Sequence, residues 1–270
     1  MPELLEGYAF TIQWFPGHMT KAKRQMESEL RMVDVVVELL DARIPRASAN
    51  PLLKGLIGSK VKIVALNKTD MADPLATKAW LTYFKEAGLK ALEVDCQKGR
   101  GVKALLTAMR EAGQPVIDKW LKKGVRNHPI RIMIVGIPNV GKSTLINRIL
   151  GKNKAAAKNR PGVTRSNQWV RITPYLELLD TPGLLWPNLS DQQDARALAF
   201  VGTINDNIMD QQMLAIRLME RLMEDHADAL ATRFKLKNHT LRGVPLLEEA
   251  CRGRGWLLPG GVCDTDRGAA

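Results

Sequence analysis

One octapeptide organises this chain: Gly136-Ile137-Pro138-Asn139-Val140-Gly141-Lys142-Ser143. It fits the pattern G-x-x-x-x-G-K-[ST] of a phosphate-binding loop. The apolar, β-branched run 130–135 before it predicts a buried parallel strand, and the run 144–150 after it predicts a helix that ends at Gly151. A glycine-rich turn between a strand and a helix is a setting in which backbone N–H groups converge on an anion. The stretch therefore predicts a nucleoside-triphosphate site.

The loop and the first turn of the expected helix divide the phosphate chemistry between them. Backbone N–H groups bind phosphate oxygens, Lys142 reaches the β- and γ-phosphates, and the Ser143 hydroxyl is a ligand for Mg²⁺. The residues that we expect to bind nucleotide in this part of the chain are Asn139, Val140, Gly141, Lys142, Ser143 and Thr144.

Composition places the chain among ordinary globular proteins with an unusual charge. Its 270 residues suffice for two domains, and 45% are hydrophobic and 25% charged. Forty Lys and Arg against 28 Asp and Glu give a formal net charge of +12, which favours a polyanionic partner, usually nucleic acid. An acidic membrane would also suit this charge, but no apolar run approaches the length of a membrane span, so no membrane partner is expected.

The cysteines and the start of the chain bear on the compartment. Cys96, Cys251 and Cys263 lie far apart and form no C-x-x-C pair, so neither a disulfide framework nor a zinc site is expected. The acidic first six residues lack the basic and apolar regions of a signal peptide. We therefore expect a cytoplasmic protein.

Strand and helix patterns alternate through the first two thirds of the chain. Strands are expected over 33–40, 61–66, 91–94, 130–135, 168–172 and 176–179, and helices over 20–32, 51–57, 74–87 and 102–123. Gly113-Gln114-Pro115 predicts an interruption of the last helix. This alternation predicts an α/β fold with a doubly wound, mostly parallel sheet.

The pattern changes near residue 188. Beyond it we find no strand pattern, and apolar residues between Met213 and Leu230 recur at helical spacing, as in the core of a small helical domain. We therefore expect two domains, residues 1–188 with the sheet and residues 189–270 as a small all-α domain.

A second nucleotide motif follows the strand expected over 61–66. Asn67-Lys68-Thr69-Asp70 fits N-K-x-D, in which the Asp70 carboxylate accepts hydrogen bonds from guanine N1–H and the 2-amino group. Adenine offers neither donor, so the acid would be left unpaired and ATP rejected. Asn67 orders the loop, and the aliphatic stem of Lys68 can cover one face of the base. After the next strand, Asp95-Cys96 is expected to bring a backbone N–H to the guanine oxygen.

A third motif lies after the last expected strand. Asp180-Thr181-Pro182-Gly183 fits D-x-x-G, in which Asp180 holds the Mg²⁺ shell through water and the Gly183 N–H meets the γ-phosphate. Thr164, in the basic loop that follows the phosphate loop, is the candidate for a second Mg²⁺ hydroxyl. The loop that carries D-x-x-G would sense hydrolysis through its contact with the γ-phosphate.

The order of the motifs is informative. The base-reading N-K-x-D precedes the phosphate loop, whereas in ordinary GTPases it comes last. The same sheet forms if the termini are moved, because the ends of a domain usually lie close together. We therefore expect a circularly permuted Ras-like P-loop GTPase domain. In it, D-x-x-G leads directly into the helical domain, so a shift at Gly183 can reorient that domain.

At this point the chain resembles the circularly permuted ribosome-assembly GTPases of the YlqF/RbgA family. The resemblance covers essentially the whole chain and rests on these segments: 14–19 (Trp-Phe-Pro-Gly-His-Met), 41–45 (Asp-Ala-Arg-Ile-Pro), 67–70, 136–143, 161–164 (Pro-Gly-Val-Thr) and 180–183. It implies hydrolysis of GTP to GDP coupled to late maturation of the large (50S) ribosomal subunit or its precursor, through rRNA, with no DNA partner expected. It also implies that the C-terminal helical domain binds RNA.

Two further roles come from the resemblance. Ras-like enzymes place a Gln that orients the attacking water directly after D-x-x-G, whereas this chain has Leu184 at that position. In the resembling family a histidine is proposed for this role, and it corresponds to His18 here. Related potassium-activated GTPases bind K⁺ with the residue equivalent to Asn139, so K⁺ is an expected cofactor beside GTP, GDP and Mg²⁺.

Alternatives remain open. In relatives the final helix continues beyond the point where this sequence ends, so the RNA-binding domain is expected to be truncated or divergent. A nucleotide-switched RNA-binding scaffold with negligible catalysis fits Leu184 equally well, as does a permuted GTPase that acts on another RNA particle. The small-subunit type of permuted GTPase is disfavoured because its N-terminal barrel pattern and Cys/His cluster are missing, and an ATPase is opposed by Asp70.

Overall fold

The computed structural model describes residues 19–151, 168–180, 191–204 and 210–270. These ranges fall into two compact units that divide between Leu198 and Ala199. Among the helices in these ranges, none is both long and apolar enough to cross a membrane.

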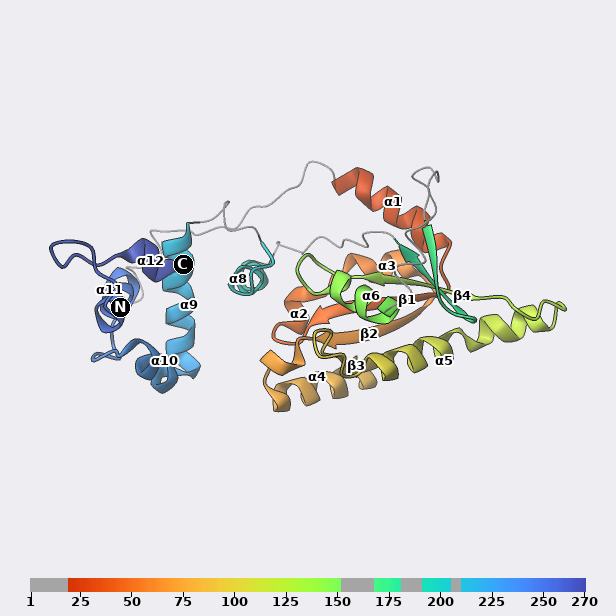
Figure 1. The fold of residues 1–270 in the computed structure, drawn as a ribbon, viewed down its shortest axis with the longest axis horizontal. Coiled ribbons are helices and arrows are strands. Elements are labelled where there is room, and N and C mark those ends of the chain that lie inside the picture. Colours follow the sequence, from red (N-terminus) through yellow and green to blue (C-terminus); the bar gives the residue numbers. More distant parts are fainter. Residues whose placement is uncertain (1–18, 152–167, 181–190, 205–209) are drawn as a thin grey trace. The chain divides into compact units, whose positions relative to one another are not determined.

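The first unit is built on a six-stranded sheet with the order β3-β2-β1-β4-β6-β5 (Figure 1). The strands are β1 (Val35–Asp41), β2 (Val61–Asn67), β3 (Lys90–Glu93), β4 (Ile130–Val135), β5 (Gln168–Thr173) and β6 (Leu176–Asp180). Every neighbouring pair is parallel except β5 and β6, which are antiparallel. The predicted α/β fold with a mostly parallel sheet is confirmed.

Burial explains why these segments are strands. Every residue of β1 is buried, as expected for a central parallel strand that is covered on both faces. In β2, Val64 and Leu66 point to the same side and pack with Leu40 and with Phe84. The core of this unit therefore lies against the strands that carry the motifs at their ends.

Among the described residues of this unit, one α-helix precedes the first strand, and five α-helices and a 3-10 turn lie between strands. They are α1 (Met19–Arg31), α2 (Pro45–Ser48), α3 (Leu52–Ile57), η1 (Thr69–Met71), α4 (Pro74–Glu86), α5 (Val102–Leu121) and α6 (Lys142–Leu150). The Asp73 carboxylate caps α4 by accepting a hydrogen bond from the Ala76 N–H at 2.7 Å. The short helix α2 is an element that the sequence pattern did not predict.

The predicted interruption of the helix that starts at Val102 is wrong. Helix α5 runs unbroken through Gly113 and Pro115 to Leu121. A Cβ at position 113 would lie 2.4 Å from Cγ2 of Ile130, so this glycine lets α5 approach β4 closely, and the packing offsets the hydrogen bond that Pro115 cannot make. Figure 1 shows the last turns of α5 reaching past the sheet.

The strand order brings the motifs to one edge. From β1 the chain proceeds outward through β2 to β3, then returns to β4 on the other side of β1. The crevice outside the carboxyl ends of strands at such a reversal is where doubly wound folds bind ligands. The residues that follow β1, β2, β3 and β4 meet at this edge.

The second unit is helical in the ranges described. Helix α8 (Gln192–Phe200) crosses the division between the units, and α9 (Gln211–Asp225), α10 (Ala227–Phe234), α11 (Gly243–Arg254) and α12 (Thr265–Ala269) follow. Ile216, Met219, Met223 and Leu230 are buried in one cluster with residues of α11, which confirms that the methionine-rich stripe forms a core. The stripe is shared by two helices because the helix breaks at His226.

Candidate nucleotide-binding site

The phosphate loop joins β4 to α6, and two of its glycines are required by their surroundings. A Cβ at Gly136 would lie 2.7 Å from the backbone oxygen of Leu39. Gly141 has a φ of +104°, and a Cβ there would lie 2.4 Å from Nδ2 of Asn67. The loop can therefore take this path only with glycine at both positions, which leaves its backbone free to approach a phosphate.

Lys142 lies across the same loop. Its Nζ donates hydrogen bonds to the backbone oxygens of Gly136 and Ile137, at 2.8 and 3.0 Å. Burial lowers the pKa of Lys142 to about 8. An ammonium group that is desolvated in this way gains from a nearby anion, so the loop and its lysine fit a polyphosphate.

The other predicted phosphate contacts surround this lysine. Ser143 and Thr144 are exposed in the first turn of α6, where backbone N–H groups favour anions, and Val140 is buried beneath the loop. Asn139 is exposed and has a φ of +57°. The structure thus brings the predicted residues 139–144 together at one helix N-terminus.

Asn67 connects three loops. Its Nδ2 donates to the backbone oxygen of Val140 at 2.8 Å, and its Oδ1 accepts a hydrogen bond from the Cys96 N–H at 3.0 Å. The residue is only 3% exposed, so both bonds are shielded from water. This one side chain joins the N-K-x-D segment to the phosphate loop and to the loop after β3.

Lys68 follows in a strained backbone conformation. Its φ is +64°, in the left-handed region. Its Nζ lies 3.0 Å from Oδ2 of Asp41, at the end of the neighbouring strand β1. The Asp41 side chain is 2% exposed and also accepts two hydrogen bonds from the Arg43 guanidinium, at 2.9 and 2.7 Å.

Asp70 faces the loop after β3. Its side chain is 21% exposed, and its Oδ2 lies 3.6 Å from Nζ of Lys98. Lys98 is itself mostly exposed. A carboxylate with one loosely held cation nearby is accessible to hydrogen-bond donors of a base.

Asp95 and Cys96 are both buried, and their contacts are internal. The Asp95 carboxylate accepts from the Lys98 N–H at 2.8 Å and from Arg100 at 3.3 Å, and the backbone bond from Lys98 is the main cause of its lowered pKa. Burial raises the pKa of Cys96 to about 12. Because the Cys96 N–H is already bound to Asn67, these two residues shape the loop from inside, and the exposed Gln97 is the next residue along it.

Arg148 of α6 holds this loop from the other side. Its Nε donates to the backbone oxygen of Cys96 at 3.3 Å, and its Nη2 donates to the backbone oxygen of Gln97. The helix that begins at the phosphate loop is therefore tied directly to the loop that was predicted to contact the base.

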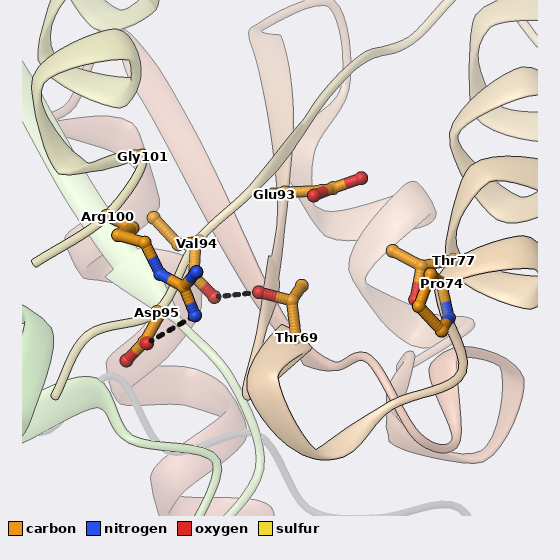
Figure 2. Close-up of a pocket in the computed structure, with 8 residues that line it drawn as sticks. All are labelled: Thr69, Pro74, Thr77, Glu93, Val94, Asp95, Arg100 and Gly101. Atoms are coloured by element: carbon orange, nitrogen blue, oxygen red, sulfur yellow. Dashed lines mark hydrogen bonds and ion pairs between the residues drawn. The ribbon is translucent and has the colours of Figure 1, made fainter. Parts of the chain in front are cut away.

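A cavity of about 400 Å³ lies beside these loops (Figure 2). Figure 2 shows the Arg100–Asp95 ion pair and the hydrogen bond from the Thr69 hydroxyl to the Val94 oxygen at its wall. The Thr77 hydroxyl, which also lines it, donates to the Asp73 oxygen. Neither the phosphate loop nor Asp70 lines this cavity, so it borders the base-recognition loops rather than forming the phosphate site.

Four predicted residues are not described at the level of their side chains. His18, Thr164 and Gly183 lie outside the described residues. For Asp180 the structure gives the backbone, which ends β6 beside β4. Their roles in catalysis, Mg²⁺ binding and contact with the γ-phosphate therefore stay predictions.

Sequence reasoning missed several residues that build this site. The sequence shows Asp41 and Arg43 only as part of a motif, and no pattern in it points to Gln97, Lys98 or Arg148. Asp41 and Arg43 are close in sequence, but Asp41 also meets Lys68, Lys98 meets Asp70, and Arg148 meets Cys96 across 52 positions. The acidic residue that ends β1, aligned with Asn67 of β2, was the one available signal.

Comparisons with known proteins agree with this geometry. Residues 131–237, from β4 onward, match the family described as 50S ribosome-binding GTPase. The ribosome biogenesis GTPase A of Priestia megaterium is 45% identical over 96% of this chain and 90% of its own length, and that of Thermotoga maritima is 34% identical over 95% and 86%.

Solved structures match over the same extent. The GNP-bound crystal structure of YlqF from T. maritima has a TM-score of 0.62 at 31% identity and covers 92% of this chain and 90% of its own. Its GDP-bound structure has a TM-score of 0.65 at 30% identity, with coverage of 91% and 90%. From the sequence identity across nearly its whole length and the matching fold, this chain belongs to the ribosome biogenesis GTPase A family.

Proposed function

We propose that this chain binds GTP and GDP, hydrolyses GTP, and acts in the assembly of the large ribosomal subunit by binding its rRNA. One observation carries the nucleotide part: Asn67 binds both the phosphate loop and the loop after β3, so the base-reading and phosphate-binding motifs form one site. The relatives named for ribosome biogenesis support the partner. A cytoplasmic location belongs to the same proposal, and cell fractionation tests it.

Guanine recognition is assigned to Asp70. Its carboxylate accepts hydrogen bonds from guanine N1–H and the 2-amino group, which take the place of the 3.6 Å contact with the exposed Lys98. Because the Cys96 N–H is used by Asn67, the N–H offered to the guanine oxygen is that of Gln97. Asp95 and Cys96 contribute by holding this loop in place.

The phosphates are assigned to the loop and α6. Lys142 exchanges its two backbone oxygens for phosphate oxygens, and the N–H groups of residues 139–144 bind the rest. Ser143, Thr164 and Asp180 would hold Mg²⁺, since hydroxyl and carboxylate oxygens are the donors that this ion prefers. When bound, Mg²⁺ neutralises charge on the phosphates. Asn139 would bind K⁺, and Gly183 would contact the γ-phosphate.

Catalysis is assigned to His18. Leu184 has no polar atom with which to orient water, so the nucleophile needs another residue. Replacing His18 by Ala tests this: GTP hydrolysis falls while GDP affinity is retained. Unchanged hydrolysis would favour the scaffold alternative, in which the chain switches its RNA contacts with little turnover.

The rRNA contact is assigned in part to the basic end of α5. Lys119, Lys122 and Lys123 line a surface hollow of about 510 Å³ together with Pro115 and Asp118. Arg126 follows in the next turn and is exposed. Trp120 stacks on His128 with ring centres 4.2 Å apart, which fixes the turn that returns to β4. A rigid, projecting basic surface suits the phosphates of a structured RNA.

The domain roles follow the predicted boundary. Residues 1–188 form the GTPase domain, and residues 189–270 form the RNA-binding helical domain with Arg233, Lys235, Lys237 and Arg242 as further candidate contacts. Cosedimentation with large ribosomal subunits tests the partner. We expect binding to large subunits that is stronger with a non-hydrolysable GTP analogue than with GDP, and no binding to small subunits. Equal binding to both subunits would contradict the assigned partner.

A further inference from the structure

A buried carboxylate with two cations lies behind the base-reading motif. Asp41 ends β1 with a side chain that is 2% exposed. The Arg43 guanidinium binds it through two hydrogen bonds, and Lys68 Nζ lies 3.0 Å from Oδ2. A buried carboxylate needs a cationic partner, but Arg43 with its planar fork already supplies one. The second cation, which comes from the N-K-x-D motif, therefore calls for a separate explanation.

The geometry of Lys68 explains why Asp41 has a second cationic partner. Its backbone leaves β2 with a φ of +64°, and its ammonium is fixed at the end of β1. The aliphatic stem between these two fixed ends lies along the ligand-binding edge of the sheet. A free lysine side chain would sample many rotamers, and fixing it in advance removes that entropic loss from the binding step.

We propose that Asp41 is a positioning residue for guanine recognition, acting through Lys68 so that the lysine stem forms one wall of the base slot before the nucleotide binds. This rests on the proposed nucleotide site. Burial opposes ionisation of Asp41, yet the hydrogen bonds from Arg43 and Lys68 hold the pKa of this carboxyl below its usual range. The anchor is therefore charged at neutral pH, and the Lys68 ammonium is neutralised by it rather than by the ligand.

The same two strands hold a matched pair away from the site. Glu38 of β1 is 1% exposed at its side chain and lies 2.7 Å from Nζ of Lys62 of β2. It also accepts a hydrogen bond from the Asn50 N–H. Both pairs join a buried β1 carboxylate to a lysine, but Lys68 directly follows β2, whereas Lys62 lies within it, five residues before Asn67 and near its opposite end.

The experiment compares Asp41→Asn with Glu38→Gln in the full chain. GDP affinity is measured by calorimetry, with ADP as the control nucleotide, and stability by urea unfolding. Both variants are expected to unfold at lower urea concentration than the wild type. The dissociation constant for GDP is expected to rise about tenfold in Asp41→Asn and to stay within about twofold in Glu38→Gln.

The double variant tests whether Asp41 acts through Lys68. Lys68→Met keeps an apolar stem and removes the charge, so it should also weaken GDP binding. Adding Asp41→Asn to Lys68→Met should cause no further loss, since the anchored group is already gone. The proposal would be overturned if the double variant lost GDP affinity by the product of the two single losses. It would also be overturned if Asp41→Asn bound GDP as tightly as Glu38→Gln.

The experiment distinguishes failure of the proposed nucleotide site from failure of the role given to Asp41. A wild-type chain that does not prefer GDP to ADP contradicts the proposed function, whereas a wild type that does, with an indifferent Asp41, contradicts only this inference. Should Asp41→Asn not fold, Asp41→Asn/Arg43→Gln carries the same prediction, because Arg43, whose side chain is 23% exposed, is then not left as an unpaired cation.

Discussion

The side-chain amide of Asn67 donates a hydrogen bond to the backbone oxygen of Val140 at 2.8 Å, across 73 positions of sequence. The same amide accepts from the Cys96 N–H, so a single buried residue holds the phosphate loop and the base loop at a fixed separation. In a permuted chain these segments arrive in reversed order, and this side chain ties them together regardless of that order.

Replacing Asn67 by Ala should therefore damage both stability and binding. The Val140 oxygen and the Cys96 N–H would each lose a partner inside the protein, at a cost of about 1–3 kcal/mol per unsatisfied group. We expect a lower urea midpoint and GDP affinity reduced by at least about tenfold. Asn238→Ala is the matched control, since the Asn238 side chain also takes part in two hydrogen bonds, both as acceptor, but is exposed and far along the chain. Equal GDP affinity in the two variants contradicts the role given to Asn67.

Gly141→Ala tests the close approach of Asn67 to the loop. The new Cβ would lie 2.4 Å from Nδ2 of Asn67 at a φ of +104°, so the loop must move. Gly124→Ala is the control, because Gly124 also has a positive φ, +81°, with nothing within 4 Å of its Cβ. Holding a non-glycine residue in this backbone region costs about 1–3 kcal/mol by itself. We expect both variants to be less stable, and Gly141→Ala alone to lose nucleotide binding in calorimetry.

Cys96 should be unreactive in the folded protein. The residue is 2% exposed, and burial raises the pKa of its thiol from 9.0 to about 12. Because the folded-state pKa is the higher one, the neutral thiol stabilises the fold fully below pH 9, and this contribution is lost as the pH rises toward 12. We expect a thiol-specific reagent at pH 8 to label Cys96 only after unfolding in urea, as read by peptide mass spectrometry. Rapid labelling of the folded chain would show that this loop is open.

The basic end of α5 should contribute to binding of the large subunit through charge. Replacing Lys119, Lys122 and Lys123 by Gln removes three cations, so the slope of log affinity against log salt should fall by about two to three. The control replaces Lys78, Lys85 and Lys103 by Gln, which are exposed on α4 and the start of α5 and cause the same change in net charge. If both triple variants lose affinity equally, the effect belongs to overall charge and not to this surface.

Local sequence patterns were sufficient to predict the strands of the sheet and two of the nucleotide motifs. The phosphate loop and N-K-x-D were predictable because each is a short segment whose backbone and side chains act together at the end of a strand. The strands were predictable because β1, β2 and β4 are short runs made mostly of apolar, often β-branched residues.

What the sequence could not supply was contact between distant segments. Gly113 and Pro115 favour a break in α5, and only the packing of Gly113 against Ile130 shows why the helix continues. Likewise Asp41 meets Lys68 because β1 and β2 are neighbours in register, with Asp41 opposite Asn67. Neither residue indicates its partner in a single sequence.

The most direct test of the account is the GTP turnover rate in KCl, measured with and without large ribosomal subunits and with ATP as the control nucleotide. We predict slow turnover by the chain alone, acceleration by large subunits, and no hydrolysis of ATP. Turnover that is unchanged by large subunits, or that is equal for ATP, would contradict it.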